Sequence, residues 1–237
     1  MSSLKLFRST EFALSSFFSP QRERAALHPV WAIVLISLWI ATVCNLALWR
    51  RLAQLPELNN ATGIWFGIGL AVMIGAATSA LLCLFAWRWT FKPVVTLLLL
   101  AAALGTYFML NDGIVIDTPA MQRVLQVKPG GVADLVRNVV NWRMLASVLV
   151  LAVLPAAWLW RKPLRRVRPG RQLVVNAFVF VASCALLAGA TVVFHEDLAS
   201  TMQRHTQLRY LVNPLNSLYA LADIAATPTA HEVDPKN

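Results

Sequence analysis

Five long apolar segments fill most of this chain, and no Asp, Glu, Lys or Arg interrupts any of them. They are Val30–Trp49, Ile64–Trp87, Val94–Leu110, Met144–Trp160 and Leu173–Phe194. A helix needs about 20 apolar residues to cross a hydrocarbon core of roughly 30 Å. Membrane strands would instead alternate apolar and polar residues, and these segments do not. Because a helix satisfies its own backbone in lipid, we predict an all-α integral membrane protein with five transmembrane helices.

The third segment, Val94–Leu110, is shorter than the about 20 residues that a span needs. We expect Gly113–Ile116 to lengthen it if Asn111 and Asp112 face protein or water. The composition supports a membrane protein, because 58% of the residues are hydrophobic and 14% are charged. A soluble domain contains about 25% charged residues.

The formal charge of +10 first suggests nucleic-acid binding, but the distribution of the charges favours a membrane orientation. Six basic residues share the loop between the fourth and fifth segments: Arg161, Lys162, Arg165, Arg166, Arg168 and Arg171. Short loops rich in Lys and Arg stay in the cytoplasm. Alternation then predicts a cytoplasmic N-terminus and a periplasmic C-terminus in a bacterial inner membrane. Arg50 and Arg51 do not fit this orientation, because they lie just outside the first helix.

The chain divides into a cytoplasmic leader (1–29), a transmembrane domain (30–194), a periplasmic connector (195–222) and a polar linker (223–237). The leader is basic and amphipathic, so it is either a short helix on the cytoplasmic leaflet or a disordered tail. The periplasmic loop 111–143 predicts short amphipathic helices. They either lie flat on the leaflet or form the floor of a soluble domain above it.

Some residues inside the segments predict helix packing. Asn45 and Asn176 are the polar amides within the apolar runs, and we expect each to form hydrogen bonds between helices. Ala71, Gly75 and Ser79 are spaced by four, which lets a neighbouring helix approach closely. The tryptophans gather at segment ends, as is typical of the membrane interface, and we assign them no binding role. The three cysteines lie within apolar runs and indicate buried thiols.

Candidate chemistry is sparse in this sequence. His195, Glu196 and Asp197 have metal-binding side chains, but consecutive residues on a helix point in different directions, so we predict no metal site there. Asp112 and Asp117 are five residues apart and can be read as a catalytic carboxylate pair. A helix cap at Asp117 and a solvated Asp112 explain them equally well. We therefore assign no catalytic residue.

Two segments nevertheless resemble a known family. The first reads Gly113-Ile114-Val115-Ile116-Asp117, with Met121 and Val124-Leu125-Gln126 after it. The second reads Asp197-Leu198-Ala199-Ser200, then Leu208-Arg209-Tyr210-Leu211-Val212-Asn213-Pro214-Leu215-Asn216-Ser217-Leu218-Tyr219-Ala220-Leu221. They resemble the loop after the third helix and the connector after the fifth helix in lipid A phosphoethanolamine transferases. The order of the helices and the basic fourth-to-fifth loop are also similar.

The resemblance implies that a five-helix membrane domain anchors a periplasmic, zinc-dependent, sulfatase-like domain. Such enzymes move phosphoethanolamine from phosphatidylethanolamine to a threonine and then to a lipid A phosphate. The threonine belongs to a Gly-Glu-Thr motif, and neither that motif nor a zinc-binding cluster occurs in this sequence. We therefore expect this chain alone to be inactive, with no cofactor of its own and with zinc only in a catalytic domain that this sequence lacks.

The resemblance also carries over individual residues. It implies contact with the lipid donor at Asp117, Arg123 and Gln126. Where the family usually has Asn, Thr and Glu, this chain has Arg123, Val127 and Gly131. Arg123 still has the chemistry to pair with a lipid phosphate, whereas Val127 and Gly131 lack a hydrogen-bonding side chain. The connector to the catalytic domain is implied at Arg209, Tyr210, Asn213 and Pro214.

Three functions remain open from the sequence. The first is a membrane domain that anchors a phosphoethanolamine transferase and presents phosphatidylethanolamine to it, with membrane lipids as partners and lipid A reached through the missing domain. The second is a truncated or diverged scaffold or lipid-binding protein without catalysis. A transporter is third, because the sequence lacks internal repeats and intramembrane charges.

Overall fold

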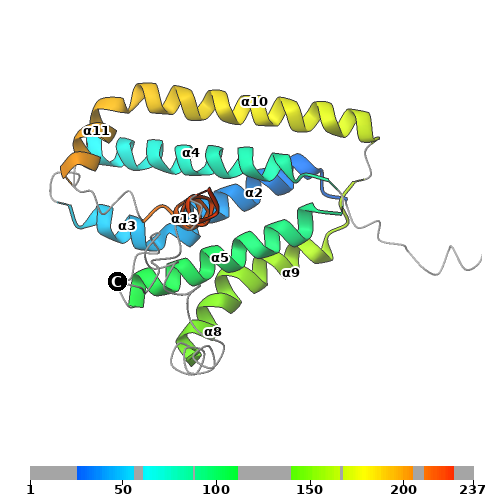
Figure 1. Cartoon of the computed structure of the whole chain (residues 1–237), viewed down its shortest axis with the longest axis horizontal. Helices are drawn as coiled ribbons and strands as arrows, with labels where there is room; N and C mark the ends of the chain where they lie inside the picture. Colours follow the sequence, from blue (N-terminus) through cyan, green and yellow to red (C-terminus); the bar gives the residue numbers. More distant parts are fainter. Residues whose placement is uncertain are drawn as a thin grey trace, which may run out of the picture.

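A computed structural model describes residues 26–55, 61–87, 89–111, 140–165, 168–204 and 211–226, and this part of the chain is helical (Figure 1). The elements are α2 (Pro29–Thr42), η1 (Val43–Asn45), α3 (Leu46–Ala53), α4 (Ala61–Leu84), α5 (Phe91–Asn111), α8 (Trp142–Val148), η3 (Leu149–Val153), α9 (Leu154–Arg161), α10 (Pro169–Val193), α11 (His195–Arg204) and α13 (Leu215–Ala226). Here η1 is a 3₁₀ turn and η3 is a π-helical turn.

The structure confirms five helices long and apolar enough to cross a membrane. The first joins α2, η1 and α3, and the fourth joins α8, η3 and α9. The predicted extension of the third helix, α5, over Gly113–Ile116 lies outside the described residues, but α5 gains length at its start. It begins at Phe91, before the apolar run, and includes Lys92 and Pro93. The proline lies in the first turn, where its missing N–H has no helical partner to lose.

The helices form a bundle in which α4 lies between α2 and α10, while α5 lies along α8 and α9 (Figure 1). The predicted small-residue stripe on α4 faces α2, because a Cβ added at Gly75 would lie 3.7 Å from the Cβ of Ala41. Nearer the start of α4, a Cβ added at Gly69 would collide with the ring of Phe194. Gly69 therefore allows the end of α10 to pack closely on α4.

One end of the bundle, here called the basic end, holds the start of α2 and the turn between α9 and α10. Residues 26–28 run beside this turn: Leu27 N–H donates to the Pro163 carbonyl at 2.9 Å, and Arg165 N–H donates to the Leu27 carbonyl at 3.0 Å. His28 then caps α2 by accepting a hydrogen bond from Val30 N–H. These bonds fix the two segments against each other, although they are far apart in the sequence.

The basic end also confirms one of the predicted interhelical amides. Asn176 Nδ2 on α10 donates to the carbonyl of Ala86, just after α4, at 3.3 Å. Gln172, one turn earlier on α10, donates to the same carbonyl and to Asn176 Oδ1. The carbonyl of Ala86 lies beyond the end of α4, where helical N–H partners are missing. The two amides supply those partners.

At the opposite end, here called the connector end, α3, α5 and α10 terminate. The first transmembrane helix breaks before it reaches this end, at η1. The Trp49 side chain folds back over the break and donates to the carbonyls of Ala41 and Thr42 at 3.1 and 2.9 Å. The break separates apolar α2 from α3, which buries Leu48 and Leu52 and leaves Arg50 and Arg51 exposed.

The fourth transmembrane helix contains a different irregularity, the π-helical turn η3, immediately before Pro155. In an uninterrupted α-helix, the carbonyl of Leu151 would accept a hydrogen bond from residue 155, and proline has no N–H to donate. The indole N–H of Trp39 on α2 donates to this carbonyl at 3.1 Å. Trp39 is thus an interhelical donor in the middle of its segment, although the tryptophans as a set were predicted to mark the membrane interface.

This pairing predicts a coupled effect of two substitutions. Trp39→Phe removes the donor to Leu151 and should lower the free energy of unfolding by about 0.5–1.5 kcal/mol. In a Pro155→Ala background, the alanine N–H can serve the same carbonyl, so the cost of Trp39→Phe should be smaller. Thermal unfolding in detergent, followed by circular dichroism, measures both costs.

Trp31→Phe is the matched control, because Trp31 lies on the same helix with an exposed side chain. Its effect should stay within about 0.5 kcal/mol. If the cost of Trp39→Phe is the same with and without Pro155, the indole does not compensate for the proline.

Candidate functional site

The predicted connector returns into the bundle between α11 and α13. Asn213 is the deepest described residue of this segment, and none of its surface is exposed. Leu211 and Pro214 on either side of it are buried as well. The sequence predicted that residues 195–222 form a periplasmic connector and that a polar linker begins at residue 223. Instead α13 continues to Ala226, so the first residues of the expected linker are helical.

The backbone of Asn213 pairs with the side chain of Asn45 in η1. Asn45 Nδ2 donates to the Asn213 carbonyl at 2.7 Å, and Asn213 N–H donates to Asn45 Oδ1 at 2.9 Å. The second hydrogen of Asn45 Nδ2 goes to the Ile40 carbonyl at 2.8 Å. In the 3₁₀ turn, both the amide nitrogen and the amide oxygen of Asn45 therefore have hydrogen-bond partners, and both bond to the connector. Asn45 was expected to form hydrogen bonds between helices; its partner outside its own helix is instead the non-helical turn at Asn213.

The side chain of Asn213 extends the pairing to α5. Its Nδ2 lies 3.1 Å from Thr106 Oγ1 and 3.3 Å from the Cys44 carbonyl, and it also donates to the Ala102 carbonyl. Thr106 in turn contacts the carbonyls of Ala102 and Cys44 through its hydroxyl. We call Asn45, Thr106 and Asn213 the connector seat, because they join η1, α5 and the connector in one buried network.

Gly105 makes room for the connector seat. A Cβ added there would lie 2.6 Å from Asn213 Oδ1 and 2.9 Å from its Cγ, closer than real Cβ atoms approach. Asn213 Oδ1 has no hydrogen-bond partner among the described residues and lies over this glycine. The missing side chain at residue 105 is therefore a steric requirement for the connector.

The connector seat lies well inside the bundle. Ala102 is nine residues before the end of α5 at Asn111, which corresponds to about 13 Å along a helix. Non-helical backbone at membrane depth is tolerated only where protein covers it. The complete burial of Asn213 meets that condition. After the seat, α13 packs Leu218 against the main apolar core of the bundle.

A second contact fixes the base of the loop after α5. Asn141 Nδ2 donates to the Tyr107 hydroxyl at 2.7 Å, and Asn141 Oδ1 caps α8 by accepting from Met144 N–H at 2.8 Å. Tyr107 follows Thr106 directly on α5. The loop that resembles the donor loop of the family therefore returns to the bundle beside the connector seat.

The predicted site residues divide between described and undescribed parts of the chain. Asn213 and Pro214 are described and lie in or next to the connector seat. Five others lie outside the described residues: Asp117, Arg123, Gln126, Arg209 and Tyr210. The pairing of Asn45 with Asn213 was missed by sequence reasoning. Asn45 gave a signal as an amide within an apolar run, but Asn213 lies outside those runs and 168 residues away, so there was no reason in the sequence to pair them.

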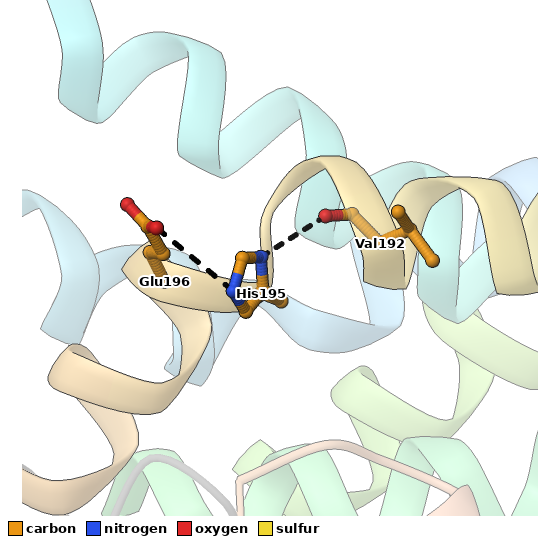
Figure 2. A network of polar contacts seen from close by, with 3 residues as sticks. All are labelled: Val192, His195 and Glu196. Carbon is orange, nitrogen blue, oxygen red and sulfur yellow. Dashed lines mark hydrogen bonds and ion pairs between the residues drawn. The ribbon is translucent and has the colours of Figure 1, made fainter.

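The charged triplet after α10 shows local contacts (Figure 2). His195 Nδ1 lies 3.2 Å from the Val192 carbonyl, and its Nε2 lies 3.9 Å from Glu196 Oε1. Both side chains are largely exposed, so this pair contributes little stability. In the described ranges, no three His, Cys, Asp or Glu side chains come together to hold a metal ion. Cys44, Cys83 and Cys184 are free thiols, and Cys184 is exposed rather than buried as expected.

Comparison with known proteins assigns the chain to a family. The sequence model described as "Phosphoethanolamine transferase EptA/EptB" matches residues 74–228, which is more than half of the chain. This chain belongs to the phosphoethanolamine transferase family.

Curated relatives agree with this assignment. Phosphatidylethanolamine transferase Mcr-2 of Escherichia coli is 26% identical over 203 residues, which cover 86% of this chain and 37% of the relative. Mcr-1 of the same species is 26% identical over 90% of this chain and 39% of its own length. Phosphoethanolamine transferase EptA of Salmonella typhimurium is 24% identical over 84% of this chain. The chain thus spans little more than a third of the length of these relatives.

The fold is also that of a solved relative. The integral membrane protein lipooligosaccharide phosphoethanolamine transferase A from Neisseria meningitidis aligns with a TM-score of 0.74 at 18% identity. The alignment covers 84% of this chain and 37% of that one. The five-helix bundle described above therefore corresponds to a membrane domain known within the family.

The steric requirement at Gly105 predicts an unusual response to alanine. Gly→Ala inside a helix normally stabilises by about 0.5–1 kcal/mol. Gly105→Ala should instead destabilise by about 1–3 kcal/mol, because the methyl group displaces Asn213 and leaves Asn45 and Thr106 unpaired. Limited proteolysis should also cut the connector faster. Thermal unfolding and a protease time course measure the two effects.

Gly189→Ala on α10 is the matched control, since a Cβ there would meet no atom within 4 Å. It should leave stability unchanged or raise it. If both glycine variants behave alike, Gly105 is not required for the connector seat.

Proposed function

We propose that this chain anchors a phosphoethanolamine transferase in the bacterial inner membrane and presents its lipid donor. The donor is phosphatidylethanolamine, and the acceptor is lipid A. In this proposal the N-terminus is cytoplasmic, and the connector end faces the periplasm. Catalysis belongs to a domain joined to the chain through α13, where zinc and a nucleophilic threonine would act. The membership of the family and the matching bundle support the anchoring role.

The connector seat is the observation that carries this proposal. A flexible link would leave a following domain free to move away from the membrane. Here the link is bound at Asn213 by hydrogen bonds to η1 and α5 before α13 begins. Enzymes gain most from substrates and catalytic groups held in fixed relative positions. A seated connector next to the base of loop 112–139 fits a platform that positions a domain over a lipid.

The charge distribution supports the proposed orientation. The described acidic residues are Glu196, Asp197 and Asp223, which all follow α10. The described part of the turn between α9 and α10 carries Arg and Lys without a carboxylate. Positive loops face the cytoplasm, so the connector end would face the periplasm. Arg50 and Arg51 remain an exception on the connector end.

A domain exchange tests the platform role. Residues 1–226 of this chain would replace the membrane domain of E. coli EptA, ahead of the remainder of that enzyme. In cells without their own transferase, mass spectrometry of lipid A should detect phosphoethanolamine. Asn213→Ala in the same fusion should reduce the modified fraction roughly tenfold or more, because the connector loses its fixed position.

Two controls accompany the domain exchange. In the first control, the membrane domain of EptA is joined to the rest of EptA through the same junction as in the fusion. Modified lipid A in this control shows that the enzyme tolerates the junction. The fusion with Gly189→Ala tests a substitution in the bundle away from the connector seat. The platform role is wrong for this chain if the fusion inserts at normal levels and leaves lipid A unmodified while the rejoined EptA is active.

The donor is tested separately on the purified chain. Lipids retained through purification should be enriched in phosphatidylethanolamine over phosphatidylcholine when both are supplied in equal amounts. Arg123→Ala combined with Gln126→Ala should reduce that enrichment severalfold, since Arg123 would contact the lipid phosphate. Arg137→Ala, in the same loop, is the matched control. Equal retention of both lipids by the unaltered chain would contradict the donor assignment.

A non-catalytic lipid-binding scaffold is the second candidate. It is favoured by Val127 and Gly131, which lack the hydrogen-bonding groups that the family usually places there. The two candidates differ in outcome: a scaffold retains lipid but gives no modified lipid A in the domain exchange.

A further inference from the structure

The turn between α9 and α10 presents a cluster of cations at the basic end. We call this cluster the basic rim. Its described members are Arg161, Lys162, Arg165, Arg168 and Arg171, and all of these side chains are exposed. The rim lies directly at the ends of two helices long enough to span a membrane, the fourth (Trp142–Arg161), which ends with α9, and the fifth, α10. Its charges are therefore placed where lipid headgroups would be.

Within the described part of the chain, no carboxylate neutralises the basic rim. Among the described residues, the acidic ones are Glu196, Asp197 and Asp223, which all follow α10, and no ion pair joins a carboxylate to a rim residue. Lys92, also at the basic end, differs from the rim residues because its side chain forms hydrogen bonds within the protein. Its Nζ donates to the carbonyls of Trp160 and Lys162 at 3.3 and 3.2 Å and lies 5.5 Å from the Trp160 ring centre. The rim side chains have no such partners among the residues that the structure describes.

The backbone beneath the basic rim is held in place. The bonds of Leu27 to Pro163 and Arg165 fix the middle of the turn. Trp160 donates its indole N–H to Thr96 Oγ1 at 3.0 Å, which fixes the end of α9 against α5. More than half of the Trp160 surface is still exposed, and indole rings favour the headgroup region. The rim is thus a preformed set of cations at the depth of lipid phosphates.

We propose that the basic rim binds the phosphodiester headgroups of anionic phospholipids. Guanidinium groups pair with phosphate oxygens through two parallel hydrogen bonds. Basic clusters next to a membrane span attract anionic lipids, with an effect of roughly fivefold in affinity for each Lys or Arg near the surface. A positive loop also guides insertion; here the rim retains anionic lipid in the folded protein. The proposal depends on the membrane bundle and not on transferase activity or the identity of the donor.

Tryptophan quenching by brominated lipid tests the basic rim. The full chain is placed in phosphatidylcholine vesicles that contain increasing amounts of brominated phosphatidylglycerol or, in parallel, brominated phosphatidylcholine. Because both leaflets have the same composition, the result does not depend on orientation. The unaltered chain should be quenched at severalfold lower mole fractions of the anionic lipid than of the neutral one.

Three variants locate the effect. Arg161→Gln, Arg165→Gln and Arg168→Gln together should abolish most of the preference for the anionic lipid. The same three positions changed to Lys should keep most of it, because the charge is retained. The matched control removes three exposed arginines from the connector end, with Arg50→Gln, Arg51→Gln and Arg143→Gln, and should keep the preference. Circular dichroism confirms that each variant is folded.

Each possible result either supports or overturns lipid binding by the basic rim. Preference for the anionic lipid that is lost only in the glutamine rim variant supports the proposal. An equal preference for both lipids in the unaltered chain overturns it, as does an equal loss in the rim and control variants. Inorganic phosphate at constant ionic strength should not displace the lipid. If it does, the rim is a site for free phosphate and the proposed lipid binding is wrong.

Discussion

The hydrogen-bonded pair of Asn45 and Asn213 is the interaction on which this arrangement of the chain depends. In lipid, apolar contact between helices brings little hydrophobic gain, so polar contacts and close packing decide which segments stay together. Asn45 has at most 1% of its surface exposed and Asn213 has none. A buried amide without partners is costly. The pair therefore favours one position of the connector, in which η1, α5 and the residues before α13 meet.

Several irregularities in the helices have a common explanation in this arrangement. The 3₁₀ turn η1 presents Asn45 to the connector, and Trp49 supplies donors to carbonyls next to the break. Gly105 lacks the side chain that would collide with Asn213. Between α2 and the fourth transmembrane helix, the Trp39 indole N–H donates to the Leu151 carbonyl, which Pro155 leaves without its α-helical donor. Each break in regular helix is matched by a side chain that satisfies the backbone, as a low-dielectric environment requires.

The sequence was sufficient to predict the five helices, because uninterrupted apolar runs of this length have few alternatives. It also indicated that Asn45 and Asn176 would form interhelical bonds, since buried amides need partners. It could not identify Asn213 as a partner, because a polar residue in a mixed segment looks the same whether it is exposed or buried. Trp39 was read as an interface marker for a similar reason: its role depends on Pro155, which belongs to another helix. Asp117, Arg123 and Gln126 remain predictions from the family resemblance.

The two ends of the bundle differ in chemistry, which suggests a division of labour. The connector end contains neutral amides and hydroxyls that position a segment, whereas the basic end carries exposed cations over a fixed turn. The most direct test of the central claim is hydrogen exchange of residues 211–217 in lipid nanodiscs. The account predicts slow exchange at Asn213, because its N–H is buried and bonded to Asn45 Oδ1. Asn45→Ala should accelerate exchange there and leave α10 unchanged. Exchange of residues 211–217 in the unaltered chain at the rate of an unstructured peptide would contradict the account.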